Sequence, residues 1–228
     1  MIKKILKKVK GILTPKEQAF NFDIDKKLIS DLLPADPVII DCGAHMGTDA
    51  LEFAKIPGSQ VHCFEPVSDI YRQLVENTKD FKNVHCYNLA LNDVDGKIDM
   101  YVSSGYSDGS SSILKPLLHL QDHPDVFFDK TEKVRCLKLD TWAAENNINA
   151  VDMLWLDMQG AEHQMLSASK IIFPAVKIIH CEVTKHESYE GVMLYPELKK
   201  FLKQHNFYEN SKAVPKKNYG GNVLFVRK

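Results

Sequence analysis

The sequence predicts an α/β protein with a mostly parallel sheet that is covered by helices on both faces. Short apolar segments alternate with segments of helical periodicity along the 228 residues, and this alternation is typical of parallel strands joined by crossover helices. Near the C-terminus two apolar segments follow each other with only a turn between them, which indicates an antiparallel hairpin at the sheet edge. Hydrophobic residues make up 44% of the chain and charged residues 26%, as in an ordinary globular domain.

The first half of the expected domain contains three strands and two helices. The strands are expected at 38–47, 61–66 and 83–91. The first strand runs into a glycine-containing turn, which a helix follows at 48–55. The second strand stops at Pro66, and Ser68 is placed to cap a helix that extends to residue 79.

The second half continues the same alternation. Strands are expected at 97–103, 133–139, 154–156, 177–183, 207–214 and 222–228. Helices are expected at 161–168 and 196–205, and the turn of the final hairpin is placed at Gly220–Gly221. A polar stretch rich in Ser, Gly and His separates the strands at 97–103 and 133–139.

The chain divides into a basic N-terminal helical segment at 1–30 and a domain at 31–228. In residues 1–14, five lysines alternate with apolar residues so that the apolar side chains share one helix face. Two interpretations stay open: this helix packs on the domain, or it contacts an anionic membrane surface. No segment is apolar enough to span a bilayer and no signal peptide is evident. We therefore expect a cytoplasmic protein, free or peripheral at the inner membrane face.

Charge and cysteine content exclude several other classes. The formal net charge is −1, so the chain has no overall positive field that would attract nucleic acid. There are five cysteines, without any CxxC pair. An odd number of cysteines within apolar segments indicates packed, reduced thiols rather than a disulfide framework or a zinc site.

The ends of the first two strands carry the residues expected to bind a ligand. In parallel α/β sheets ligands bind beyond the carboxyl ends of the strands. The first strand ends in Asp41-Cys42-Gly43-Ala44-His45-Met46-Gly47, and the second ends at Glu65. Glycine allows the backbone to turn sharply and to approach a ligand closely, and an acid at the position of Glu65 can accept hydrogens from both hydroxyls of an adenosine ribose.

Two cofactor classes fit this layout, and the charge of Asp41 favours one of them. A dinucleotide places its pyrophosphate over a turn that is usually GxGxxG, whereas the spacing here is GxxxG, with Asp41 two residues before the first glycine. A carboxylate is unfavourable beside a pyrophosphate and favourable beside the sulfonium and ammonium groups of S-adenosylmethionine. A nicotinamide-dependent oxidoreductase and a turn without function stay open as alternatives.

Six motifs together make the resemblance specific. IIDCGAHMG, CFEP, NLAL, LKLDTW, LWLDMQGAE and GGNVLFV occur in this order from residue 38 to the C-terminus, and the chain resembles the FkbM family of methyltransferases. The resemblance implies a class I methyltransferase (Rossmann-like) fold with seven strands, S-adenosylmethionine as cofactor, and methyl transfer to hydroxyl oxygens of sugars or polyketides. The cofactor-binding residues that it implies are Asp41, Gly43, His45, Gly47, Glu65, Pro66, Leu89, Ala90 and Asp157.

Two residues depart from the family pattern. His45 stands where the family usually has Asn, and Gln159 where it usually has Glu. The second departure removes a negative charge beside the expected substrate site, so a mechanism that needs that glutamate is in doubt. An inactive module that has kept the fold therefore stays open as an alternative function.

Methyl transfer to an alcohol needs a group that removes the hydroxyl proton. The candidate catalytic residues at the strand ends are Asp157, His163, Glu182 and His186. Asp157 is our first choice, because it ends the fourth strand and faces the methyl group in this fold. As an alternative, Glu162 and His163 serve only the start of the following helix. Asp157, Glu182 and His186 are also possible ligands of Mg²⁺, but their spacing does not demand a metal and we predict none.

The expected acceptor is a small molecule or glycan with a free hydroxyl. The serine-rich stretch 103–112, with His119 and His123 beyond it, is placed either to contact a polyhydroxylated acceptor or to form a solvated loop. Nucleic acid is not expected as an acceptor, because Asp157-Met158-Gln159-Gly160 lacks the proline and the aromatic residue that would hold a flipped base.

Overall fold

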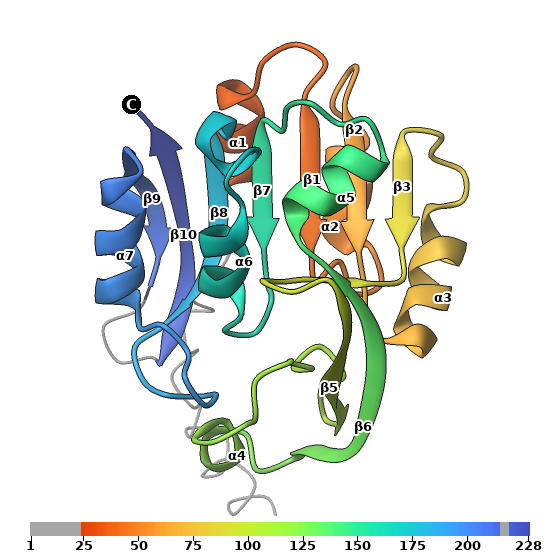
Figure 1. Cartoon of the computed structure of the whole chain (residues 1–228), viewed down its shortest axis with the longest axis vertical. Helices are drawn as coiled ribbons and strands as arrows, with labels where there is room; N and C mark the ends of the chain where they lie inside the picture. Colours follow the sequence, from red (N-terminus) through yellow and green to blue (C-terminus); the bar gives the residue numbers. More distant parts are fainter. Residues whose placement is uncertain (1–23, 215–218) are drawn as a thin grey trace, which may run out of the picture.

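A seven-stranded sheet forms the centre of the computed structural model, which describes residues 24–214 and 219–228 (Figure 1). The strands are β1 (Val38–Cys42), β2 (Gln60–Phe64), β3 (Val84–Tyr87), β4 (Ala90–Leu91), β5 (Gly96–Gly105), β6 (Val126–Leu137), β7 (Met153–Leu156), β8 (Ile178–Thr184), β9 (Phe207–Ala213) and β10 (Gly220–Arg227). The order in the main sheet is β3-β2-β1-β7-β8-β10-β9. Neighbouring strands are parallel from β3 to β8, and β10 pairs antiparallel with both β8 and β9. The predicted parallel sheet and C-terminal hairpin are confirmed.

Helices cover both faces of this sheet, as predicted. They are α1 (Lys26–Leu32), α2 (Thr48–Phe53), α3 (Ser68–Thr78), α4 (His119–Asp122), α5 (Leu139–Glu145), α6 (Glu162–Ala168) and α7 (Tyr195–Gln204), with a 3-10 helix at Phe173–Ala175. Apolar side chains of α5, α6 and α7 pack in one buried cluster, with Ile40 and Leu154 of the sheet. Those of α1, α2 and α3 pack in a second cluster, with Ile39 and Val61. Adjacent strand residues point to opposite faces, so the strands are apolar on both sides.

A second, three-stranded sheet of order β4-β6-β5 lies below the carboxyl ends of the parallel strands in Figure 1, with α4 beside it. The predicted strands at 97–103 and 133–139 are therefore not part of the main sheet; they belong to the longer β5 and β6, which pair antiparallel. This arrangement places the small sheet next to the ends of β1, β2 and β7, where a ligand of this fold binds.

Three local predictions were wrong. The single strand expected at 83–91 is two strands in different sheets, because the chain turns at Asn88, whose amide donates to the carbonyls of Glu65 and Pro66 at 2.9 and 3.0 Å. Ser68 is the first residue of α3 rather than its cap, and its hydroxyl donates to Glu132 instead. The glycine pair Gly220–Gly221 lies in β10 rather than in the turn.

Close packing of β10 against β8 and β9 explains why glycines stand within β10 at Gly220 and Gly221. A β-carbon on Gly221 would lie 2.1 Å from the carbonyl oxygen of Ala213 in the neighbouring strand. Helices α4 and α5 were not expected, because each is short and α5 begins within a segment that reads as the end of a strand.

All five cysteines are free thiols, and four of them are buried. The prediction of reduced cysteines without a disulfide framework agrees with this. The exception to full burial is Cys86, which is partly exposed.

The basic segment at 1–14 lies outside the described residues, so its membrane or domain contact stays a prediction. The expected boundary between residues 30 and 31 falls within α1, and Ile29 of this helix is buried in the domain core. None of the helices described in the structure has the length and apolarity needed to cross a bilayer.

Candidate active site

The loop after β1 brings backbone from two strand ends into contact. Gly43, His45 and Gly47 all have positive φ angles, of 81°, 48° and 88°. A β-carbon on Gly43 would lie 1.9 Å from the carbonyl oxygen of Asp157. Only glycine can therefore occupy this position, and its absence of a side chain lets the end of β1 meet the end of β7.

Glu65 follows β2 and fixes the position of this loop. It is 5% exposed, and its two carboxylate oxygens accept hydrogen bonds from the backbone N–H groups of His45 at 3.1 Å and Val67 at 2.7 Å. Burial raises the pKa of Glu65 to about 7, although these hydrogen bonds act in the opposite direction. Each carboxylate oxygen can accept more than one hydrogen, so Glu65 remains able to bind two further hydroxyls.

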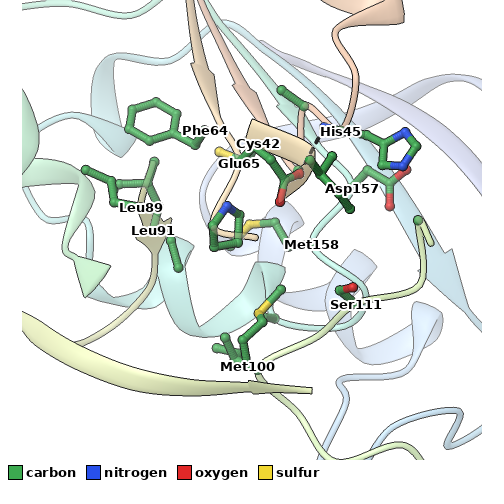
Figure 2. A pocket seen from close by; sticks show the side chains of 18 of the residues that line it. Cys42, His45, Phe64, Glu65, Leu89, Leu91, Met100, Ser111, Asp157 and Met158 are labelled. Atoms are coloured by element: carbon green, nitrogen blue, oxygen red, sulfur yellow. Dashed lines mark hydrogen bonds between the residues drawn. The ribbon is translucent and has the colours of Figure 1, made fainter. Parts of the chain in front are cut away.

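A cavity of about 250 Å³ opens beside the loop after β1, residues 43–47, which we call the glycine loop. We call this cavity cavity one. Figure 2 shows apolar side chains of Phe64, Leu89 and Leu91 on one side of it, His45 and Asp157 on the other, and Glu65 between them. Of the predicted cofactor residues, the cavity lining includes Gly43, His45, Glu65, Pro66, Leu89, Ala90 and Asp157. The lining therefore has an apolar end and an acidic end, joined by a buried carboxylate.

Asp41 and Gly47 do not line this cavity. Asp41 is 1% exposed and its Oδ2 atom lacks a hydrogen-bond partner among the described residues. Burial raises the pKa of Asp41 well above its usual range, and the charges of Asp49 and Asp157 add to this effect. The charge attributed from the sequence to Asp41 is therefore supplied at the cavity surface by Asp49 and Asp157, which do line it.

Asp157 and Glu182 meet at the ends of β7 and β8, and Gln159 connects them. The Nε2 atom of Gln159 donates to Oδ1 of Asp157 and to Oε2 of Glu182, each at 2.7 Å. The two carboxyl groups also contact each other directly. The sequence prediction that Asp157 and Glu182 converge is met by this geometry.

The pKa values of both carboxyl groups are raised, and the rise is greater for Glu182. Burial raises the pKa of Glu182 well above its usual range, and the charge of Asp157 raises it further. Burial also raises the pKa of Asp157, but this side chain opens onto the cavity and its bonds from Glu182 and Gln159 lower the pKa again. Two adjacent carboxyls cannot both ionise freely, so Asp157 is the member that is ionised first.

A larger cavity of about 420 Å³ lies on the other side of Gln159, and we call it cavity two. Its lining includes Gln159, Glu182 and His186, and Gly109 borders both cavities. The Nε2 atom of His186 lies 2.8 Å from Oδ2 of Asp122. The described lining of the two cavities contains neither lysine nor arginine.

His163 lies away from both cavities. Its Nε2 atom is 2.9 Å from the hydroxyl of Ser167, and its ring packs edge-on against Phe201. The neighbouring Glu162 turns back to accept hydrogen bonds from the backbone N–H groups of Met158 and Gly160 at 3.0 and 3.2 Å. Glu162 therefore holds the loop after β7, and His163 has no place in a mechanism at the cavities.

The serine-rich segment is ordered by its own hydrogen bonds and lies over both cavities. The backbone N–H of Ser103 donates to Oγ of Ser111, and that of Ser110 donates to Oγ of Ser103, both at 3.0 Å. Ser111 lines cavity one, whereas Ser107 and Ser110 line cavity two. The structure thus places this segment at the cavities, while contact with an acceptor stays a prediction.

The metal alternative has no geometric support in the described part of the chain. Among residues 24–214 and 219–228, His, Cys, Asp and Glu side chains do not gather in any group of three that could hold a metal ion. Asp157, Glu182 and His186 thus do not converge as a ligand set, although the last two line the same cavity.

Comparison with known proteins identifies the family. Residues 41–208 match the model of the methyltransferase FkbM domain. This chain belongs to the FkbM methyltransferase family. The resemblance described from the sequence is confirmed, and the nicotinamide-dependent alternative is set aside.

Two relatives of this FkbM-family enzyme differ widely in how much of their own length matches this chain. The 2-O-methyltransferase NoeI of Sinorhizobium fredii is 32% identical over 174 residues, which cover 74% of this chain and 72% of NoeI. The AMB antimetabolite synthetase AmbE of Pseudomonas aeruginosa is 27% identical over 163 residues, which are 59% of this chain and only 8% of AmbE. The fibrillarin pre-rRNA processing protein of Methanococcus jannaschii shares the fold, with a TM-score of 0.52, 14% identity, and coverage of 86% of this chain and 68% of that one.

S-adenosylmethionine is the cofactor of this methyltransferase family, and the residues of cavity one fit it. The apolar end at Leu89 and Leu91 suits an adenine, Glu65 suits the ribose hydroxyls, and the acidic end suits a sulfonium and an ammonium group.

Several cavity residues were missed by the sequence analysis. Asp49, Asp108, Met100 and Trp155 line cavity one, and Tyr189 lines cavity two. Asp49 carried a usable signal, because it stands in the first turn of the helix after the glycine loop. Trp155 lies in β7, a strand that was predicted, whereas Met100, Asp108 and Tyr189 come from segments whose position next to the main sheet is not visible in the sequence.

Proposed function

We propose that this FkbM-family enzyme transfers a methyl group from S-adenosylmethionine to a hydroxyl oxygen of an uncharged sugar, glycan or related polyol bound in cavity two. The observation that carries the proposal is the position of Asp157. Its carboxylate lines cavity one and is joined through Gln159 to Glu182, which lines cavity two. An acceptor hydroxyl bound in cavity two would then lie near an ionisable carboxylate at the acidic end of cavity one, where the sulfonium group of the cofactor is expected.

The proposed chemistry needs one base and close positioning. Bound S-adenosylmethionine supplies an electrophilic methyl carbon: an oxygen–carbon bond forms while the carbon–sulfur bond breaks, and the bonding pair leaves on sulfur. Asp157 accepts the hydroxyl proton as the new bond forms. Burial raises the pKa of Asp157, and the charge of Asp49 adds to this effect. The pKa of this base is thereby brought closer to neutral pH, where general bases work best.

Cavity two supports an uncharged acceptor. It presents carboxyl groups of Glu162 and Glu182 and the polar groups of Thr184 and Tyr189, while its described lining lacks lysine and arginine. A phosphate or carboxylate group placed there would meet negative charge without a lysine or arginine among the described lining residues to compensate it. Hydroxyl groups, in contrast, can both donate to carboxylates and accept from a ring N–H of His186. The name of NoeI, a 2-O-methyltransferase, is consistent with oxygen as the atom that is methylated.

The proposal is tested by the formation of S-adenosylhomocysteine from S-adenosylmethionine in the presence of matched acceptors. Each neutral glycoside is compared with its own phosphate ester, which keeps the remaining hydroxyls and adds charge. We expect turnover with members of the neutral series and at least tenfold less with their phosphates. Turnover confined to phosphorylated acceptors would overturn the acceptor class. Binding of S-adenosylmethionine without turnover on any acceptor would favour the inactive module instead.

A further inference from the structure

The side-chain amide of Gln159 lies between the carboxyl groups of Asp157 and Glu182, and contacts with other segments of the chain fix its position. It adopts a positive φ angle of 51°, which is uncommon for a residue other than glycine. Its backbone carbonyl accepts from the hydroxyl of Ser112 at 2.8 Å, and its side-chain Oε1 atom lies 3.0 Å from the hydroxyl of Tyr189. These contacts come from two separate segments of the chain, so the orientation of Gln159 is imposed by the surrounding fold.

The orientation of the amide group follows from its partners. Both carboxylates can accept hydrogens from the amide nitrogen, whereas the opposite orientation would place Oε1 against two carboxyl groups. Tyr189 supplies a hydroxyl hydrogen that can be donated to Oε1 or to the carbonyl of Ser110, which lies 2.8 Å away. The amide nitrogen therefore uses its two hydrogens on Asp157 and Glu182.

Two adjacent carboxyl groups require positive charge or shared hydrogens between them. The described lining around this pair provides neither lysine nor arginine, and Glu162 adds a third acidic group nearby. Two interactions therefore keep Asp157 beside Glu182: the hydrogen bonds from the amide of Gln159 and the proton that the two carboxyl groups share. A carboxylate at position 159 would add another acidic group directly between Asp157 and Glu182, an oxygen-rich arrangement that divalent cations bind.

We propose that Gln159 is a positioning residue whose amide N–H groups, rather than a metal ion, hold Asp157 and Glu182 together, and that Gln159→Glu converts this point into a divalent cation site. The wild-type enzyme then needs no metal to keep Asp157 facing cavity one. The variant needs one, because three carboxylates without a shared donor repel each other. The metal-binding part of this inference rests on geometry alone, and only its catalytic consequence rests on the proposed function.

The test measures Mn²⁺ binding to the full-length protein by electron paramagnetic resonance and calorimetry. We expect Gln159→Glu to bind one Mn²⁺ at least tenfold more tightly than the wild type. Adding Asp157→Asn to this variant should remove the gain, and Glu190→Gln, at an exposed position on the loop before α7, should leave it unchanged. A folded Gln159→Glu protein with the Mn²⁺ affinity of the wild type would contradict the inference.

A second variant keeps the inference testable if Gln159→Glu does not fold. Gln159→Met keeps the length of the side chain and removes its donors without adding charge. We expect S-adenosylmethionine affinity within about threefold of the wild type, turnover reduced at least tenfold, and a shifted pH profile of turnover. Wild-type protein that binds Mn²⁺ tightly and loses it in Asp157→Asn, or wild-type turnover abolished by EDTA, would overturn the inference. Because Mn²⁺ binding needs no acceptor, failure here is distinguishable from failure of the proposed reaction.

Discussion

The Nε2 atom of His45 lies 2.8 Å from Oδ1 of Asp108, and this contact joins the glycine loop to the serine-rich segment. Both residues line cavity one. The two side chains are 31% and 54% exposed, so the pair itself contributes at most about 1 kcal/mol. The contact holds the serine-rich segment at the lining of cavity one.

Loss of this contact should weaken cofactor binding without destabilising the domain. We expect Asp108→Ala to raise the Kd for S-adenosylmethionine roughly twofold to fivefold, since an exposed pair is worth up to ~1 kcal/mol. Asp99→Ala is the matched control, because Asp99 forms an exposed pair with Lys133 on the same small sheet, at 2.9 Å. Calorimetry checks both; equal affinities in the two variants would remove the role given to Asp108.

Cofactor affinity should depend on pH through Glu65. Its pKa of about 7 means that Glu65 is protonated below this pH and ionised above it, and the ionised form accepts ribose hydroxyl hydrogens better. We expect adenosine, which has the ribose but no sulfonium, to bind about tenfold more tightly at pH 8 than at pH 6, since a hydrogen bond to a charged group contributes ~1.5 kcal/mol or more. In Glu65→Gln the pH dependence should disappear. A pH dependence retained in that variant would assign it to another group.

Gly43 is required for steric reasons that another glycine of similar φ does not share. Gly43 and Gly191 have φ angles of 81° and 74°, but a β-carbon on Gly191 would have no neighbour within 4 Å. Gly191→Ala should therefore cost about 1 kcal/mol of stability through backbone strain alone. Gly43→Ala should cost more, because its β-carbon would collide with Asp157, and it should lower cofactor affinity at least tenfold. Urea unfolding and calorimetry measure both, and equal effects would contradict the close approach of β1 and β7.

Glu162 should make the stability of the protein fall as pH rises. Burial raises its pKa to about 7, so the folded state holds its proton more tightly than the unfolded chain, whose glutamates titrate near the ordinary value. The contribution of Glu162 is then complete below about pH 4.5 and is lost as pH rises to about 7. We expect Glu162→Gln to gain on the order of 1–3 kcal/mol relative to the wild type between these pH values.

Buried histidines make the stability of the protein rise with pH, which opposes the effect of Glu162. The contribution of Glu162 must therefore be measured as the difference in stability between the wild type and a variant. Burial lowers the pKa of His62 and His119 to about 4, which makes the stability of the whole protein rise over part of the same range. Glu190→Gln, at an exposed position, is the control for Glu162→Gln. A constant difference between Glu162→Gln and the wild type across this range would show that Glu162 titrates normally.

The main sheet and one of the two cavities were predictable because their signals are local. The ends of β1 and β2 carry glycine and acidic residues directly after apolar segments, so Gly43 and Glu65 could be assigned before the fold was known. Asp157 and Glu182 were found for the same reason, since each stands at or near a strand end. Asp41 was predicted to line the cavity but is buried beside it, because it lies within β1 and is paired with Cys63 on one side and Trp155 on the other.

Cavity two depends on contacts that no periodicity reveals. The segment before α4 is joined to the segment after β8 by a hydrogen bond from the backbone N–H of Leu117 to the carbonyl of Ser188, at 2.8 Å. This pairing brings Tyr189 to Ser110 and Gln159. Neither segment has a strand or helix pattern of its own, so their contact, and the role of Tyr189, could not be inferred from the sequence.

The most direct test of the central claim follows the methyl group in a single turnover. Full-length wild-type and Asp157→Asn proteins, with cofactor affinity measured in parallel, are mixed with S-adenosylmethionine carrying a labelled methyl group and with an acceptor that shows turnover. We predict that the wild type places the label on a hydroxyl oxygen, and that Asp157→Asn binds the cofactor within about tenfold of the wild type but transfers the label at least 100-fold more slowly, within the range of general-base contributions. Label on nitrogen or carbon, or undiminished transfer by Asp157→Asn, would contradict the account.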